Sequence, residues 1–281
     1  MTRTSSGLPE KIDGFLWGLL DRVGANPLYK KWVRDYWYPG ITKASAKGDR
    51  LFLNFGYEEV PPMGLPLEPA DEPNRLWIQL YHVTASQMDI GGKDVLEVSC
   101  GHGGGASYLV RTFHPSSYTG LDFNPEGIAF CQKRYDLPGL SFVHGDAENL
   151  PFPDASFDAL VNVEASHAYS NFERFLREVA RVLRPGGHFL YGDLRRNEEI
   201  KEWDEALAAF PLRLVAQRDI TPGIVRALEI NSPRLNEEID RDTPAYLRFL
   251  SRELAHVAGS RSYRDMERGH DVFRTYCFTK D

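Results

Sequence analysis

The sequence contains little cysteine, no excess of basic residues and no long apolar run near its start. Its three cysteines, Cys100, Cys131 and Cys277, form no CxxC pair, so neither a disulfide framework nor a zinc site is expected. Acidic residues outnumber basic ones, 40 to 33, and the net charge of -7 argues against nucleic acid as a partner. The apolar run at 15–20 is too short to span a bilayer. We therefore expect a cytoplasmic protein without an integral membrane segment.

Composition and pattern divide the chain into a lid region and a main domain. With 42% hydrophobic and 26% charged residues, the composition is that of a globular protein, and 281 residues suffice for a large core. Residues 91–281 are expected to form the main domain, with a helical cap inserted at about 222–258. The lid region, 1–90, is rich in aromatic residues, and helices are predicted in it near 9–23, 27–37 and 72–89.

Between residues 91 and 221, short apolar runs alternate with helical segments, which is typical of βαβ units and a parallel sheet. Helices are predicted over 106–113, after Asn124-Pro125 and over 171–183. Strands are predicted at 95–98, 118–121, 141–144, 157–163, 188–191, 212–218 and 272–278. We therefore expect an α/β fold with a Rossmann-like, doubly wound sheet of seven mostly parallel strands, an antiparallel last strand and an N-terminal helical lid.

The clearest candidate for a binding site is the turn after the first predicted strand. The segment Gly101-His102-Gly103-Gly104-Gly105 separates this strand from a helix, an arrangement that brings backbone N–H groups to the edge of a crevice. Glycine is favoured there because a Cβ would block a ligand or forbid a positive φ. About twenty residues later, Asp122 ends the second strand, where a carboxylate can accept both hydroxyls of a ribose. These features fit any cofactor that carries a ribose.

Two later segments narrow the choice of cofactor. Asp146 leaves the third strand at the same end of the sheet, where it can accept a hydrogen bond from an adenine amino group, and Arg184-Pro185-Gly186-Gly187 makes a turn before the fifth strand. The ordered blocks VLEVSCGHG, TGLD, GDAENLPF, SFDALVNVEASH and LRPGG resemble those of the class I S-adenosylmethionine-dependent methyltransferases over about residues 90–195. The resemblance implies S-adenosylmethionine as cofactor and S-adenosylhomocysteine as product.

One position departs from the family pattern. Ser99 stands where the acid-x-Gly-x-Gly-x-Gly turn of the family has its first glycine, and we expect its hydroxyl to reach the methionine carboxylate of the cofactor. The residues that this interpretation assigns to cofactor binding are Glu97, Ser99, Cys100, Gly101, Gly103, Asp122, Phe123, Asn124, Asp146, Ala147 and Glu164.

A closer resemblance extends over most of the chain beyond about residue 30. The segments NFGYEEVPP, EPNRLWIQLYH, NVEASHAY and the ending YCFTKD look like those of the mycobacterial phthiotriolone/phenolphthiotriolone dimycocerosate methyltransferases and related lipid or sugar O-methyltransferases. This implies methyl transfer to a hydroxyl of a lipid, polyketide or glycosidic small molecule. No metal is expected, because no carboxylate cluster has recognisable ligand spacing. A homodimer and peripheral contact with a membrane remain open.

Two residues after the fourth predicted strand are candidates for catalysis. His167 follows the carboxyl end of this strand, the end that faces the crevice in such sheets, and an imidazole there can take the proton of an acceptor hydroxyl. Alternatively, His167 packs against or caps the helix that begins near Asn171. Glu164 is assigned to the same site, where it orients His167, binds the positive end of the cofactor or caps a loop.

Several alternatives remain at this level. Carbon or nitrogen methylation would use the same cofactor site, and a non-catalytic partner subunit would retain the fold. A nicotinamide-dependent reductase would need a Tyr-x-x-x-Lys pair on a helix, but the match at Tyr276 and Lys280 falls in a predicted strand. An aromatic cluster is expected either to cover an apolar acceptor or to pack on the core. Its members are Trp32, Tyr36, Trp37, Tyr38, Phe52, Phe55 and Tyr57.

Overall fold

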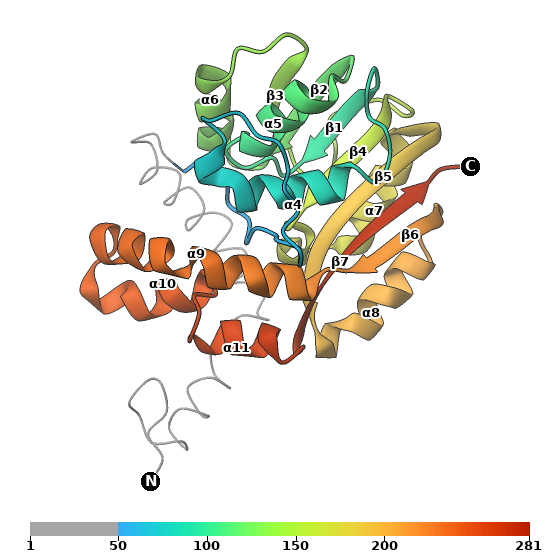
Figure 1. Cartoon of the computed structure of the whole chain (residues 1–281). Coiled ribbons are helices and arrows are strands. Elements are labelled where there is room, and N and C mark those ends of the chain that lie inside the picture. The colour runs from blue at the N-terminus through green and yellow to red at the C-terminus, as the bar shows by residue number, and fades with distance from the viewer. Residues whose placement is uncertain (1–49) are drawn as a thin grey trace.

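The computed structural model describes residues 50–281, which form one seven-stranded sheet with helices on both faces (Figure 1). The helices predicted at 9–23 and 27–37 lie outside the described residues, as do four members of the aromatic cluster, Trp32, Tyr36, Trp37 and Tyr38. Of the lid region, the structure therefore describes only the last part.

The strand order is β3-β2-β1-β4-β5-β7-β6. The sheet is parallel except for β7, which runs antiparallel to both of its neighbours, β5 and β6. This confirms the predicted α/β class, the seven strands and the antiparallel last strand. The strands are β1 (Asp94–Val98), β2 (Ser117–Asp122), β3 (Leu140–His144), β4 (Phe157–Val163), β5 (Leu183–Arg196), β6 (Arg213–Asp219) and β7 (Asp271–Thr279).

Apolar side chains on the two faces of the sheet form two hydrophobic cores. One core lies between the sheet and α4, α5, α6 and α9, and it contains Ile78, Leu109, Ile128 and Ile224. The other packs α7 and α8 against the opposite face. The helices are α4 (Arg75–Ala85, preceded by the 3-10 turn η2, Glu72–Asn74), α5 (Gly104–Phe113), α6 (Pro125–Arg134), α7 (Phe172–Val182), α8 (Asn197–Ala208) and α9 (Thr221–Asp242).

Several elements differ from the sequence prediction. The helix predicted at 72–89 is α4, Arg75–Ala85, with the turn η2 before it. α5 begins at Gly104 rather than at 106, because the last two glycines of the turn form the first helical residues. β5 extends from Leu183 to Arg196, far beyond the predicted 188–191, because it pairs with β7 along nine residue pairs. α8 was not predicted, since its charged sequence buries only Trp203 and Leu207.

The region of the predicted cap, 222–258, is helical. It comprises α9, the 3-10 turn η4 (Ala245–Leu247) and α10 (Arg248–Leu254), and α11 (Arg261–Glu267) follows it. Figure 1 shows α9, α10 and α11 grouped beside one end of the sheet, away from α8. Within residues 50–281, no helix combines the length and apolarity needed to cross a bilayer.

Candidate active site

The loops that follow the central parallel strands begin at one edge of the sheet. Val98 of β1 pairs with Leu121 of β2, and Asp122 pairs with His144 of β3, so the carboxyl ends of these strands are level. Crevices at this edge are where open α/β sheets bind ligands. The following residues are placed relative to this carboxyl edge.

In the turn after β1, the backbone alternates between positive and negative φ. Ser99, Gly101 and Gly103 all have positive φ, at 64°, 55° and 74°, while Cys100 and His102 between them do not. The N–H groups of Cys100 and Gly103 donate to the carbonyls of Leu121 and Cys100, so the alternation closes the turn on itself. Gly103 also forms the N-cap of α5. Serine is strained in a left-handed conformation, which explains why glycine is usual at the position of Ser99.

Asp122 connects this turn to the loop after β2. Its two carboxylate oxygens accept hydrogen bonds from the backbone N–H groups of Gly101 and Asn124, each at 2.8 Å. Burial raises the pKa of Asp122, although these backbone bonds act in the opposite direction. Each oxygen has a second lone pair, so the carboxylate retains capacity for two more donors. Asp122 therefore faces the glycine turn, as a ribose-binding residue must.

Below the turn, a polar network reaches a buried amide. The hydroxyls of Ser99 and Tyr169 lie 2.7 Å apart, and Asn162 donates from Nδ2 to Tyr169 Oη and to the carbonyl of Val98, each at 2.9 Å. Asn162 is fully buried, yet its Oδ1 has no hydrogen-bond partner. An unpaired buried acceptor is costly, so this oxygen is suited to a donor group brought by a ligand.

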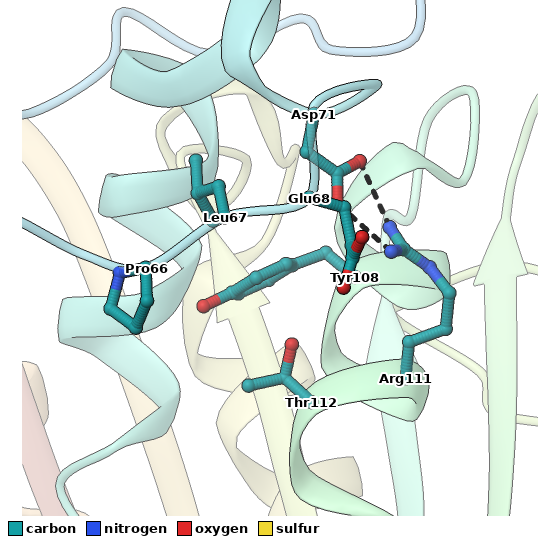
Figure 2. Close-up of a pocket in the computed structure, with 7 residues that line it drawn as sticks. All are labelled: Pro66, Leu67, Glu68, Asp71, Tyr108, Arg111 and Thr112. Atoms are coloured by element: carbon teal, nitrogen blue, oxygen red, sulfur yellow. Dashed lines mark hydrogen bonds and ion pairs between the residues drawn. The ribbon is translucent and has the colours of Figure 1, made fainter.

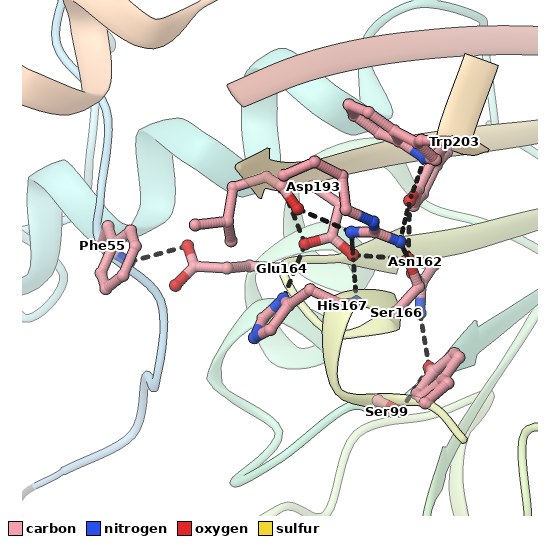
Figure 3. Close-up of polar contacts among 12 residues, drawn as sticks. Phe55, Ser99, Asn162, Glu164, Ser166, His167, Asp193 and Trp203 are labelled. Carbon is pink, nitrogen blue, oxygen red and sulfur yellow. Dashed lines mark hydrogen bonds and ion pairs between the residues drawn. The ribbon is translucent and has the colours of Figure 1, made fainter. Parts of the chain in front are cut away.

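His167 is held by a buried carboxylate that the sequence analysis did not identify. Asp193, on β5, lies with Oδ1 2.8 Å from His167 Nδ1, and its Oδ2 accepts the backbone N–H of His167 at 2.9 Å (Figure 3). Burial alone would raise the pKa of Asp193. The charges of His167 and Arg195 and the hydrogen bonds to this carboxylate outweigh burial and keep the pKa well below its usual range. An ionised Asp193 only accepts, so Nδ1 carries the imidazole proton and Nε2 presents a lone pair.

Further contacts hold Asp193 itself. Ser166 donates its hydroxyl to Oδ2 at 2.5 Å, and Arg195 Nη1 lies 3.3 Å from the same oxygen. The Arg195 guanidinium stacks 5.1 Å from the Phe172 ring centroid and 4.9 Å from that of Trp203. Because Arg195 is held by these two rings, Asp193 and His167 have little freedom to reorient. Asp193 lies in the extension of β5 beyond the predicted strand, which is why the sequence pattern did not place it.

Glu164 lies beside this pair. It has a positive φ of 50°, and Oε2 accepts the backbone N–H of Phe55 at 2.9 Å, as Figure 3 shows. Burial, with the charge of Asp193 adding to it, raises the pKa of Glu164 well above its ordinary value. Burial therefore favours the neutral form of this carboxyl group, which is able to donate as well as accept. The structure brings Glu164 and His167 to the same edge, but no hydrogen bond joins them.

The segment 50–58 crosses this edge, and we call it the strap. At one end, Leu51 accepts the backbone N–H of Gly104 at 3.2 Å, and the Leu53 side chain covers Gly101. At the other end, Phe55 binds Glu164. The strap therefore runs from the glycine turn to the end of β4. Of the three described members of the aromatic cluster, Phe52 and Tyr57 are buried in the core, and Phe55 lies in the strap near Glu164.

Other residues assigned from the sequence lie elsewhere or make different contacts. Glu97 is buried and accepts from Tyr118 Oη at 2.9 Å, and burial raises its pKa to about 7. Cys100 is buried and binds the Leu121 carbonyl through its backbone N–H. Ala147 belongs to the loop after β3 and is buried. The side chains of these three residues face the protein interior.

The loops after β2 and β3 supply the remaining candidates. Asp146 accepts the backbone N–H of Glu148 at 2.9 Å, and Asn124 caps α6 by accepting from Glu126. The Phe123 ring lies 6.2 Å from that of His144 and is 38% exposed, so it is accessible to a planar ligand. All three lie at the carboxyl edge of the sheet.

A separate depression of about 340 Å³ lies between α5 and the chain before α4 (Figure 2). Two of its charged groups are paired with each other, because Arg111 makes two hydrogen bonds to the Asp71 carboxylate. It is remote from the carboxyl edge. Across residues 50–281, no three His, Cys, Asp or Glu side chains are grouped so as to hold a metal ion.

Comparison with known proteins agrees with this geometry. A family model described as "Methyltransferase domain" matches residues 96–191. A phthiotriol/phenolphthiotriol dimycocerosates methyltransferase of Mycobacterium tuberculosis is 57% identical over 94% of this chain and 97% of its own. The chain belongs to the class I S-adenosylmethionine-dependent methyltransferases. This methyltransferase is also 53% identical to a fatty-acid O-methyltransferase of Mycolicibacterium smegmatis, over 98% of this chain and 97% of the relative.

A solved structure shares the fold at low sequence identity. The sarcosine dimethylglycine methyltransferase from Galdieria sulphuraria superposes with a TM-score of 0.68 at 15% identity, covering 87% of this chain and 98% of its own. The reductase alternative has no support in the structure. Tyr276 lies within an aromatic stack on β7, and Lys280 donates to the backbone carbonyls of Ala180 and Leu183, so the methyltransferase has no Tyr–Lys pair there.

Proposed function

We propose that this methyltransferase transfers the methyl group of S-adenosylmethionine to a hydroxyl of a lipid acceptor, with His167 as general base. The observation that carries the proposal is the His167–Asp193 pair, in which a buried carboxylate fixes the tautomer of an imidazole at the carboxyl edge. The relatives named above act, by their names, on phthiotriol lipids and on fatty acids. Hydroxyl-bearing and carboxyl-bearing lipids are thus the two acceptor classes to distinguish.

The residues around the glycine turn fit the cofactor. Asp122 has lone pairs for the ribose hydroxyls, and the Ser99 hydroxyl, beside the turn, is assigned to the methionine carboxylate. Asn162 Oδ1, the unpaired buried acceptor, suits the methionine ammonium. When bound, the sulfonium supplies an electrophilic methyl group. Asp146, Ala147 and Phe123 are assigned to the adenine, and Asn124 to the ribose side.

The protein itself then has two tasks. It accepts the proton of the acceptor hydroxyl, and it excludes water from the carboxyl edge of the sheet. As the acceptor oxygen attacks, its proton passes to His167 Nε2, and the ionised Asp193 stabilises the imidazolium that forms. The neutral form of Glu164, which burial favours, is able to donate a hydrogen bond to an acceptor oxygen. The strap, with Phe55 and Leu53, covers this edge and limits access of water.

The test is His167→Ala, measured with a long-chain alcohol as acceptor. We expect kcat to fall by roughly 10²–10⁴-fold, while the affinity for S-adenosylhomocysteine by calorimetry stays unchanged. His270→Ala is the matched control, because His270 is 63% exposed and pairs only with Asp265. An undiminished kcat in His167→Ala removes His167 from the mechanism.

A second candidate, methylation of a fatty-acid carboxylate, is favoured by the 53% identical relative. A carboxylate is already ionised near neutral pH and needs no base. With a fatty acid as acceptor, His167→Ala should therefore retain most of its activity. One experiment compares the loss of kcat in His167→Ala with the alcohol and with the fatty acid. The ratio of these two losses distinguishes the candidates. Carbon or nitrogen methylation would give a product of different mass-spectrometric fragmentation from an ether or ester.

A further inference from the structure

His256 comes from the region of the predicted cap but lies at the candidate active site. It follows α10 and is 89 residues beyond His167 in the sequence. Its ring packs on that of Phe55, with centroids 4.4 Å apart and planes tilted by 47°. The backbone of Phe55 in turn binds Glu164, three residues before His167. His256 thus adjoins the group formed by the strap, Glu164 and His167.

The backbone of His256 is held in an unfavourable conformation. Its φ is 49°, which is uncommon for a residue other than glycine. The next two residues are anchored, because Val257 donates to the Arg252 carbonyl at 3.0 Å and Ala258 donates to Ser232 Oγ on α9 at 2.7 Å. Conformations of this kind persist where the surroundings determine them, and they concentrate at ligand sites. The anchors therefore fix the direction of the imidazole.

The hydrogen bonding of the ring determines what it offers to a ligand. Nδ1 lies 3.3 Å from the Leu254 carbonyl, which can only accept, so the proton of the neutral ring resides on Nδ1. Burial lowers the pKa of His256 to about 4, and the charges of His167 and Arg196 lower it as well. The ring is therefore neutral near pH 7. No residue in 50–281 donates to Nε2, which presents a lone pair.

We propose that His256 positions the acceptor by accepting a hydrogen bond at Nε2 from a second hydroxyl, so that the enzyme prefers diols over mono-alcohols. This rests on the proposed function, in which the reacting hydroxyl is bound by His167. A single hydroxyl has only one proton to donate, so an acceptor bound at both His167 and His256 needs a second hydroxyl. A fatty-acid carboxylate has none and gains nothing from His256. Through His256, the cap thereby binds a part of the acceptor that does not react.

The variant His256→Asn tests this, because asparagine tolerates a positive φ but is too short to replace the imidazole. The matched control is His114→Asn, since His114 is an exposed residue with a φ of 51° at the end of α5. The acceptors are a long-chain alkyl diol and the mono-alcohol of equal length, and the readout is the ratio of their kcat/KM values. We expect His256→Asn to reduce this ratio roughly fivefold, mainly through an increase in KM for the diol.

The possible outcomes are distinguishable. A diol preference that survives in His256→Asn overturns the inference, as does a wild-type enzyme without such a preference. An equal loss with both acceptors shows a structural role for His256 and overturns it too. If the wild-type enzyme methylates neither alcohol, the proposed function fails, and the inference fails with it.

Discussion

Asp193 connects the chemistry of the site to the interior of the sheet. It is fully buried, ionised and bound to His167, Ser166 and Arg195 at once. Its position on β5 means that the orientation of the imidazole is set by the most rigid part of the fold. Because Asp193 acts on the reaction only through His167, its replacement should change the pH dependence of the rate.

We expect Asp193→Asn to lower kcat by roughly 10²–10⁴-fold, because an amide can present its NH₂ group to Nδ1 and favour the wrong tautomer. The pH profile of kcat should also shift, since the imidazolium loses its counter-charge. Ser166→Ala is the control: it removes one hydrogen bond to the same carboxylate and leaves the contact with His167 in place. A variant Asp193→Asn with the profile and kcat of the wild type would contradict a positioning role.

Tyr169 offers a test of cofactor binding at the level of one hydroxyl. Tyr169→Phe removes the oxygen that Ser99 and Asn162 share. We expect the dissociation constant for S-adenosylhomocysteine to rise roughly fivefold, because the turn after β1 loses a support and Asn162 loses a partner. Calorimetric titration measures this, with the 84% exposed Tyr246→Phe as the control variant.

How far the site could be predicted depends on where each residue lies along the chain. Asp122 and His167 each end or follow a predicted strand, so their place at the carboxyl edge followed from topology. Glu97 was also assigned to the cofactor, and the strand pattern gave no sign that one of its carboxylate oxygens accepts a hydrogen bond from Tyr118 in the core. Asp193 and His256 depend on packing between distant segments, which no local pattern encodes. The roles of the assigned residues stay predictions.

At the scale of elements, periodicity located six strands to within two residues at each end, because alternating apolar runs and buried parallel strands are distinctive. The bounds predicted for β5 were wrong by several residues at both ends, since its start pairs with β4 and its end with β7. All seven residues of the mostly polar β6 are exposed. This strand therefore also depends on its pairing with β7.

The start of α7 gives a prediction about stability. Asn171 is its N-cap and accepts the backbone N–H of Arg174 at 2.9 Å. Asn171→Ala should lower the free energy of unfolding by about 1 kcal/mol, whereas Asn171→Asp keeps the acceptor and should change it little. Urea denaturation followed by circular dichroism gives both values. Equal stabilities of the two variants would show that the cap contributes nothing.

For the whole molecule, Asp271 predicts how stability depends on pH. Burial raises the pKa of Asp271 to about 6, even though the charge of Arg196 lowers it. Between the ordinary pKa of about 4 and this value, the folded state binds a proton that the unfolded state has lost. The contribution of Asp271 to stability is therefore complete at low pH and is lost as the pH rises through about 6.

The variant Asp271→Asn lacks this titration. Relative to the wild type, its free energy of unfolding should increase by on the order of 2 kcal/mol between pH 4 and pH 7. Denaturation at four pH values in this interval measures the change, and taking the difference between the two proteins cancels groups that titrate in both. A difference that is constant with pH would mean that Asp271 ionises normally in the folded protein.

The strap has a consequence for the order of events in turnover. It is bound to the glycine turn at one end and to Glu164 at the other. A nucleoside seated beneath the strap, as we propose for the cofactor, would be enclosed by the chain itself. Exchange of S-adenosylhomocysteine for S-adenosylmethionine would then require these hydrogen bonds to break. For good acceptors, release of S-adenosylhomocysteine rather than methyl transfer would be rate-limiting. The steady-state rates for different lipids would then approach the same maximum.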